Sequence, residues 1–304
     1  MKYLQFVVLL FFSSIVFGQD TILPLWPQGK IPNHVITKEK EVRKQNEILR
    51  ISNVQQPTIE VYLPSKRQAT REAVLIFPGG GYGVLAYDWE GTDIAKFLNG
   101  NGIAGIVVKY RLPSSKTQTN KFNVPLIDAQ RAMRLVRSKA EEFYIDADKI
   151  GILGFSAGGH LAATLGTHFS EEIYEPIDFI DEQSARPDFM ALGYPVISFG
   201  AYAHMGSRKN LIGERPTSEM VTYFSTEKQV KENTPPTFLF HASDDKVVSV
   251  TNSILFYEAL KEKGISATMH IYPNGGHGFS LGLKDSYLRG WTDRMLEWMG
   301  SLKE

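Results

Sequence analysis

The sequence predicts an α/β fold in which a mostly parallel central sheet is covered by helices on both faces. Short runs rich in β-branched and aromatic residues alternate along the chain with segments whose apolar residues recur at helical spacing. Such alternation indicates a parallel sheet with helices packed on it. The sequence contains no internal repeat, low-complexity tract or Ser/Pro-rich linker, so residues 19–304 are expected to form one domain.

Composition excludes some classes of partner. The chain has 304 residues, 43% of them hydrophobic, which is enough for a large core. Lys plus Arg and Asp plus Glu each total 33 and form no long run of one sign, so we expect no nucleic-acid partner and favour an electrically neutral one.

The first 18 residues have the pattern of a secretory signal peptide. One positive charge at Lys2 precedes a long apolar stretch and then small residues, which places cleavage near Gly18 and Gln19. A membrane anchor is the alternative, but polar residues interrupt a stretch already shorter than the roughly 20 apolar residues of a span. We therefore expect export to the periplasm or beyond, with no stable membrane insertion after cleavage. The chain has no cysteine, so disulfides lend no support to this expectation.

The strands and helices are expected in alternating order. The predicted strands are 73–77, 105–110, 150–155, 190–196, 237–242 and 268–272, and the predicted helices are 126–143, 156–169, 249–264 and 287–303. Before residue 58 the pattern is weaker. The segment LPLWPQGKIPN, residues 23–33, is punctuated by proline, so we expect it to be irregular and to lie over the surface of the sheet.

The stretch GFSAGGH, residues 154–160, contains the first candidate for chemistry. Ser156 lies between a predicted strand and a predicted helix, in the pattern G-x-S-x-G. A sharp strand-to-helix turn strains the serine backbone and exposes its hydroxyl, and glycines on either side provide the room. The same turn places the amide of Ala157 at a helix N-terminus, where it can stabilise an oxyanion. An ordinary N-cap or turn is the alternative.

Three further loops after predicted strands supply matching groups. FPGGGYG, residues 77–83, offers the amides of Gly80 and Gly81 as further oxyanion donors, and it lacks the lysine or glycine spacing of a phosphate-binding loop. HASDDKVVSV offers Asp244 or Asp245 as an acid, and NGGHGFSLG offers His277 as a base. The order serine, acid, histidine is the one that a G-x-S-x-G nucleophile requires, so we favour a catalytic site over four unrelated turns.

Together, FPGGGYG, GFSAGGHLA, HASDDKVV and GGHGF resemble the α/β-hydrolase superfamily, and most closely its secreted carbohydrate-esterase-like members of the acetylxylan-esterase type. The resemblance extends over nearly the whole mature chain. One departure is Pro78, which occupies the place of the histidine in the HGGG motif of hormone-sensitive-lipase-like enzymes. The resemblance implies that Asp245 is the triad acid, four residues after His241, and that Asp244 braces the turn.

The resemblance also implies a reaction. His277 would take the proton of Ser156, the serine would attack an ester carbonyl, and water would hydrolyse the acyl-enzyme. The expected substrate is a small-molecule or oligosaccharide ester, acetyl esters above all. No cofactor is needed, and no metal is expected, because the sequence has neither HExxH nor a tight His/Asp cluster.

Two segments are candidates for the substrate pocket, namely residues 197–216 and, on the other side, YDWEG, residues 87–91. The polar stretch 197–216 is longer than a usual connection and could cover the site, or could be a solvated loop. The candidate substrate-binding residues are Tyr82, Trp89, Tyr202, His204 and Arg208. His160, His241 and His270 are expected to be packed residues, and the polar group Tyr110, Arg111, Asp128 and Arg131 is expected to be a structural ion-pair network.

Three alternatives to the acetyl esterase stay open. They are a feruloyl esterase, a peptidase resembling the prolyl oligopeptidase group, and a catalytically silent sugar-binding protein on the same scaffold. The chain is too short for the large propeller domain that the peptidase group usually carries, and the complete set of catalytic motifs argues against the silent protein.

Overall fold

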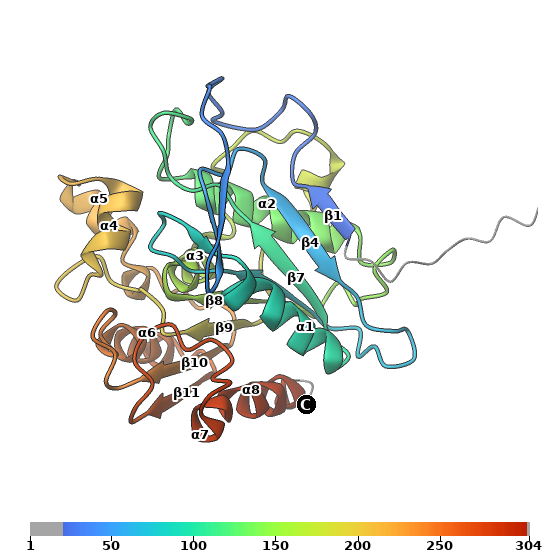
Figure 1. Ribbon diagram of the computed structural model, residues 1–304, viewed down its shortest axis with the longest axis vertical. Coiled ribbons are helices and arrows are strands. Elements are labelled where there is room, and N and C mark those ends of the chain that lie inside the picture. The colour runs from blue at the N-terminus through green and yellow to red at the C-terminus, as the bar shows by residue number, and fades with distance from the viewer. Residues whose placement is uncertain (1–20, 303–304) are drawn as a thin grey trace, which may run out of the picture.

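A computed structural model describes residues 21–302 (Figure 1). The predicted signal peptide, residues 1–18, lies outside the described residues. The strands are β1 (Thr21–Pro24), β2 (Val42–Gln45), β3 (Leu49–Ser52), β4 (Thr58–Tyr62), β5 (Ala73–Phe77), β6 (Leu85–Ala86), β7 (Ala104–Lys109), β8 (Ile150–Phe155), β9 (Met190–Gly193), β10 (Thr237–Ala242) and β11 (Ala267–Tyr272). The α-helices are α1 (Asp93–Gly100), α2 (Val124–Ser138), α3 (Ser156–His168), α4 (Met205–Ile212), α5 (Ser218–Tyr223), α6 (Thr251–Glu262), α7 (Ser286–Arg289) and α8 (Trp291–Ser301). Short helical turns are η1 (Asp88–Thr92), η2 (Phe179–Glu182) and η3 (Thr226–Lys228).

A large central sheet organises the fold. Within residues 21–302 it has eight strands in the order β1-β4-β7-β5-β8-β9-β10-β11. The six strands from β7 to β11 run parallel, whereas β4 pairs antiparallel with β7 and with the edge strand β1. The predicted mostly parallel sheet is confirmed, and β8, which leads into Ser156, lies inside it rather than at an edge.

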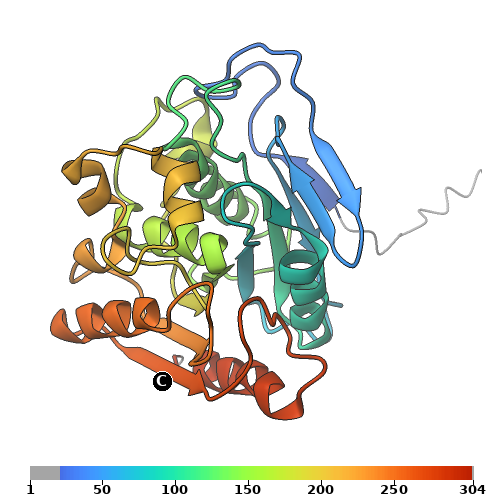
Figure 2. The same ribbon diagram turned by 60° about the vertical axis from the view of Figure 1, so that its left-hand side comes forward.

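Helices cover both faces of this sheet, also as predicted. Helices α1 and α8 lie on one face, and α2, α3 and α6 lie on the other (Figure 2). The strands between these layers are mostly apolar, and every residue of β5, β8 and β10 is buried. Continuous apolar runs of this kind are expected where a strand is buried on both faces.

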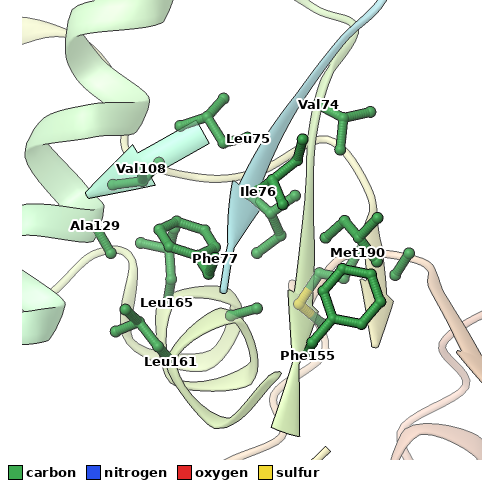
Figure 3. Packing of buried hydrophobic residues seen from close by; sticks show 14 of the residues in the cluster. Val74, Leu75, Ile76, Phe77, Val108, Ala129, Phe155, Leu161, Leu165 and Met190 are labelled. Carbon is green, nitrogen blue, oxygen red and sulfur yellow. The ribbon is translucent and has the colours of Figure 1, made fainter. Parts of the chain in front are cut away.

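The core on the α3 side packs directly beneath the candidate nucleophile. Phe77 from β5 lies near Leu161 and Leu165 from α3, and Met190 from β9 packs against the same helix, whereas Phe155 from β8 packs against Trp291 of α8 on the other face (Figure 3). All six side chains are less than 2% exposed. Ser156 is therefore carried by a strand end and a helix that are both fixed by packing.

The N-terminal segment differs from the expectation of an irregular surface strip. Leu23 and Pro24 belong to β1, which extends the central sheet, and Leu25 and Trp26 are buried. The backbone of Leu25 bonds to Pro57, and the indole of Trp26 donates to Asp128. Hydrogen bonds to β4 therefore give the start of this segment a regular strand structure in spite of its prolines.

A second, small sheet was not predicted. It consists of β2, β3 and β6, and its hairpin β2–β3 projects from the N-terminal part of the chain. All four residues of β2 are exposed, so no apolar pattern marks the strand in the sequence.

The polar group near the strand ends is a set of buried ion pairs, as expected. Arg111 binds both oxygens of Asp128 through Nε and Nη2, at 2.9 and 2.7 Å. Arg131 pairs with Asp178 and Asp181 at 2.7 and 2.9 Å. No helix in the described part of the chain is long and apolar enough to span a membrane.

Candidate active site

Ser156 occupies a strained turn between β8 and α3. Its φ of 52° lies in the left-handed region, which is rare for a residue with a side chain. Gly158 is required here, because a Cβ at that position would lie 2.0 Å from the carbonyl oxygen of Phe77. The close packing of α3 on β5 therefore fixes the direction of the serine side chain.

A continuous line of hydrogen bonds joins Ser156, His277 and Asp245. The Ser156 Oγ lies 2.9 Å from His277 Nε2, and His277 Nδ1 lies 2.6 Å from Asp245 Oδ2. The carboxylate can only accept, so Nδ1–H donates to it and Nε2 is free to accept the serine proton. This arrangement can deprotonate a hydroxyl and then hold the proton on the imidazole.

The Asp245 carboxylate is fixed by four donors. Its Oδ1 accepts from the backbone N–H groups of Val247 and Val248, and its Oδ2 accepts from His241 Nε2 at 3.1 Å as well as from His277. Burial raises the pKa of Asp245, but these hydrogen bonds outweigh burial and hold that pKa well below its usual range. The carboxylate is thus ionised and aligned with His277.

Asp244 makes a different contact. Its Oδ1 accepts from the backbone N–H of Gly276 at 2.8 Å, and its side chain is exposed. It therefore braces the loop of residues 274–282, which we call the histidine loop, without reaching the imidazole.

The loop of residues 78–83, which we call the glycine loop, lies beside the serine. Gly80 and Gly81 line the same cavity as Ser156, and their N–H groups have no acceptor within residues 21–302. Ala157 lies in the first turn of α3, where backbone N–H groups have no acceptor within the helix. Three amide donors are thus available near the serine hydroxyl.

A cavity of about 950 Å³ opens over these groups. Its walls come from the glycine loop, the histidine loop, η1, the start of α4, and the β2–β3 hairpin. The lining residues include Ser156, His277, Gly80, Gly81, Trp89, Glu90, His204, Val247, Glu47, Ile48, Arg50 and Lys284. Its volume lies in the range of ordinary ligand sites.

Only two of the five candidate substrate-binding residues line this cavity, namely Trp89 and His204. Tyr82 does not: it is 2% exposed, and its hydroxyl lies 2.8 Å from His160 Nδ1. Its positive φ of 59° turns the side chain inward. The expectation of a substrate contact from Tyr82 is therefore corrected.

Tyr202 and Arg208 are also outside the lining of the cavity. Tyr202 is 50% exposed and Arg208 is partly buried. The 197–216 segment nevertheless reaches the site, since Asn210 Nδ2 donates to the carbonyl of Gly81 at 2.8 Å. The segment is therefore more than a solvated loop.

His204 presents a defined hydrogen-bond donor. It is the N-cap of α4, and its Nδ1 accepts from the Ser207 N–H at 3.3 Å and from the Ser207 hydroxyl at 2.8 Å. A backbone N–H can only donate, so Nδ1 is unprotonated and Nε2 carries the proton. Burial lowers the pKa of His204, and His277 adds to that effect, so the ring is held neutral.

Three supporting residues were missed in the sequence as partners of this site: Glu90, Tyr194 and His241. Each is less than 5% exposed. His241 and Asp245 are only four residues apart in the sequence, and this short separation could have indicated their contact. The contacts of Glu90 and Tyr194 join distant segments, and no local pattern marks them. Within residues 21–302, no group of three or more His, Asp or Glu side chains could hold a metal ion.

The fold and site define a protein of the α/β-hydrolase class. The family model BD-FAE matches residues 59–260, and the chain belongs to the BD-FAE family. It is 38% identical over 236 residues to the endo-1,4-beta-xylanase B of Butyrivibrio fibrisolvens, covering 78% of this chain and 36% of that protein. It is 35% identical over 234 residues to the acetylxylan esterase of Xylanibacter ruminicola, covering 75% of this chain and 44% of that protein.

The chain thus spans less than half the length of these two relatives. A solved structure matches over nearly its full length. This is an acetyl ester-xyloside bifunctional hydrolase from Caldicellulosiruptor lactoaceticus, with 37% identity, a TM-score of 0.82, and coverage of 95% of this chain and 99% of that chain.

Proposed function

We propose that the protein is a serine esterase that removes acyl groups, acetyl above all, from carbohydrates. The observation that carries the proposal is the hydrogen-bonded line Ser156–His277–Asp245 at a cavity of ligand size. Family membership and the names of the two relatives and the solved structure, which include an acetylxylan esterase and an acetyl ester-xyloside hydrolase, support the same substrate class.

The reaction begins with attack of Ser156 Oγ on the ester carbonyl carbon while its proton passes to His277 Nε2. The tetrahedral intermediate expels the sugar oxygen, which takes the proton from the imidazolium and leaves as an alcohol. In the second half, His277 takes a proton from water as the water attacks the acyl-serine carbonyl. Ser156 Oγ then leaves and takes that proton back, and acetate is released. Asp245 holds the histidine tautomer and stabilises the imidazolium.

The negative charge of each tetrahedral intermediate falls on the former carbonyl oxygen. We assign its stabilisation to the amides of Gly80, Gly81 and Ala157. The assignment is supported by the unpaired state of the two glycine amides and by their position on the cavity wall. Preorganised donors of this type cost no reorganisation during the reaction. No metal or other cofactor enters the scheme.

Substrate binding is assigned to Trp89 and His204, the two candidates on the cavity wall. The indole of Trp89 offers a face on which a sugar ring can stack. The Nε2–H of neutral His204 offers a donor to a sugar hydroxyl or ester oxygen. A cavity of about 950 Å³ has room for an oligosaccharide end as well as for a small ester.

Two organisational expectations remain part of the proposal. Residues 1–18 act as a signal peptide that exports the protein to the periplasm or beyond, and residues 19–304 form one catalytic domain. The first is supported by the leader pattern in the sequence. The second is supported by the single central sheet, whose strands come from both ends of the described chain.

The deciding experiment follows acetate release by mass spectrometry from a panel of acetylated xylo-oligosaccharides, with Ser156→Ala as the matched control. With wild type, each acetyl group removed should lower the mass of the oligosaccharide by about 42 Da. With Ser156→Ala the mass should not change. Faster turnover of feruloyl esters or peptide anilides would replace the acetyl esterase by those alternatives. Sugar binding without turnover of any ester would identify a silent binding protein.

A further inference from the structure

Glu90 is a buried carboxylate beside the serine that the reaction scheme does not use. It lies in the turn η1, lines the cavity and is 4% exposed. Its Oε2 accepts from the backbone N–H of Gly79 at 2.8 Å, and its Oε1 accepts from the hydroxyl of Tyr194 at 2.8 Å. The two oxygens of the Glu90 carboxylate therefore accept hydrogen bonds from two different segments of the chain.

The first segment is the glycine loop. Gly79 is wedged between Glu90 and the nucleophile, because a Cβ on Gly79 would lie 2.7 Å from Glu90 Oε2 and 2.9 Å from the Cβ of Ser156. Only Gly79 thus lies between the Glu90 carboxylate and Ser156. Its bond to the Gly79 N–H fixes the backbone immediately before Gly80 and Gly81.

The second segment is the histidine loop, which is reached through Tyr194. The Tyr194 hydroxyl accepts from the backbone N–H of Ser280 at 3.0 Å, so its own proton goes to Glu90. The Tyr194 ring also packs edge-on against His277, with ring centroids 5.1 Å apart. Displacing Tyr194 would therefore disturb both the backbone and the imidazole of this loop.

The neighbouring Trp89 adds two more bonds from the same turn to the histidine loop. Its indole Nε1 donates to the carbonyl of Gly278 at 2.8 Å, and its own carbonyl accepts from the Ser280 hydroxyl. The turn η1 is therefore bonded to the histidine loop by side chain and backbone, and to the glycine loop by Glu90. No other residue in the described chain bonds to Gly79 and Tyr194 together.

We propose that Glu90 is a positioning residue, which sets the glycine loop and the histidine loop at a fixed distance from each other across Ser156. The proposal rests on the proposed function, since it matters only if the two loops act on one tetrahedral intermediate. Oxyanion donors and the imidazole must be placed together to within a fraction of an ångström, and supporting hydrogen bonds provide that precision.

Glu90 is not itself a catalytic residue. Both of its oxygens accept from other groups, and it makes no hydrogen bond to Ser156 or His277. Burial raises the pKa of Glu90, while the bonds from Tyr194 and Gly79 and the nearby His277 favour the ionised form. Those contacts offset only part of the rise, so the pKa of Glu90 stays above its ordinary value.

The test compares Glu90→Gln with wild type on p-nitrophenyl acetate. The amide can accept only on its oxygen, so one of the two donors loses its partner. We expect kcat to fall by about 10- to 100-fold, the effect of slight misplacement of reacting groups, with KM within about twofold. A small alkylboronic acid, which forms a tetrahedral adduct with a serine oxygen, should lose affinity by a similar factor.

Two further variants make the result specific. Tyr194→Phe keeps the carboxylate and the Gly79 bond, so it should lower kcat less, and adding it to Glu90→Gln should cost little more because both act through one contact. If Glu90→Gln does not fold, Tyr194→Phe carries the test. Asp88→Asn is the matched control: it is a carboxylate of the same turn that bonds to the backbone of Leu49, and its kcat should be unchanged.

Unchanged kcat and boronate affinity in Glu90→Gln, with only a lower melting temperature, would show a structural role and overturn the proposal. A rise in KM alone would also overturn it, because it would make Glu90 a substrate contact. Failure of the proposed function can be distinguished from failure of the positioning role of Glu90. If wild type hydrolyses no ester, the rate at which a fluorophosphonate labels Ser156 still reports positioning, and that rate should fall in Glu90→Gln by the same factor.

Discussion

The Oδ2 atom of Asp245 lies 2.6 Å from Nδ1 of His277, the shortest bond in the line that ends at the serine. The change Asp245→Asn keeps the shape but places an amide where a carboxylate accepts the Nδ1 proton. The imidazole then favours the wrong tautomer, and kcat should fall by roughly 10⁴-fold, as in other triads. Steady-state kinetics on p-nitrophenyl acetate measure this loss.

Asp244→Asn is the matched control for that variant. Asp244 accepts from the backbone of Gly276 and does not reach the imidazole. Its replacement should cost at most about 1–2 kcal/mol of unfolding free energy and much less activity than Asp245→Asn. A larger loss of kcat in Asp244→Asn than in Asp245→Asn would reverse the assignment of the acid.

Ser156→Ala should abolish ester turnover and leave the fold intact. Alanine removes the hydroxyl that bonds to His277, and loss of a triad nucleophile costs on the order of 10⁴-fold or more. The residue remains in a left-handed conformation with φ of 52°, which alanine adopts about as poorly as serine, so the melting temperature should change little. Wild-type activity in this variant would remove the triad from the mechanism.

Activity should depend on one proton on the acid side. The hydrogen bonds to Asp245 hold the pKa of its carboxyl well below the usual range, so this group stays ionised at every pH above about 4. Within the hydrogen-bonded line from Ser156 to Asp245, acidification can then stop the reaction only at the base. The logarithm of kcat/KM should rise with a slope of one as pH increases and then level off. A slope of two between pH 4 and 7 would mean that a second group titrates.

The parts of the fold that the sequence predicts are those with continuous apolar runs. The strands 73–77, 150–155 and 237–242 match β5, β8 and β10 residue for residue, because burial on both faces leaves an unmistakable pattern. The helix α4 and the strand β2 carry mainly polar residues and depend on tertiary contacts, so no periodicity marks them. The predicted strand 190–196 stops at Gly193, where Tyr194 takes a positive φ and Pro195 has no N–H.

The residues of the site also fall into two groups, those that a local sequence motif marks and those whose position depends on distant contacts. Ser156, Asp245 and His277 each belong to a short local motif, and the structure brings these three side chains into one hydrogen-bonded line. Glu90 belongs to YDWEG, which was expected at the pocket, but no local pattern predicts its bond to Tyr194, which lies far along the chain. The inward direction of Tyr82 likewise depends on His160 and on a backbone angle that its glycine-rich surroundings do not specify.

His204→Asn tests whether the donor on the cavity wall binds the sugar. Asparagine is among the best N-cap residues, so it can replace the bond that His204 makes to the Ser207 N–H and keep α4 in place. Its shorter side chain withdraws the Nε2–H donor from the cavity. A hydrogen bond to a sugar hydroxyl contributes on the order of 1–2 kcal/mol, so kcat/KM for acetylated xylo-oligosaccharides should fall by roughly 10-fold.

The same variant should hydrolyse p-nitrophenyl acetate at nearly the wild-type rate, because that ester has no sugar to bind and its leaving group departs readily. Met205→Ala is the control, since Met205 begins the same helix, is 62% exposed and does not line the cavity. It should leave both reactions unchanged. Equal losses on the two esters in His204→Asn would assign His204 to the chemistry or to the shape of the site. No loss on either ester would exclude it from substrate binding, so each of the two kcat/KM values must be compared with that of wild type to decide its role.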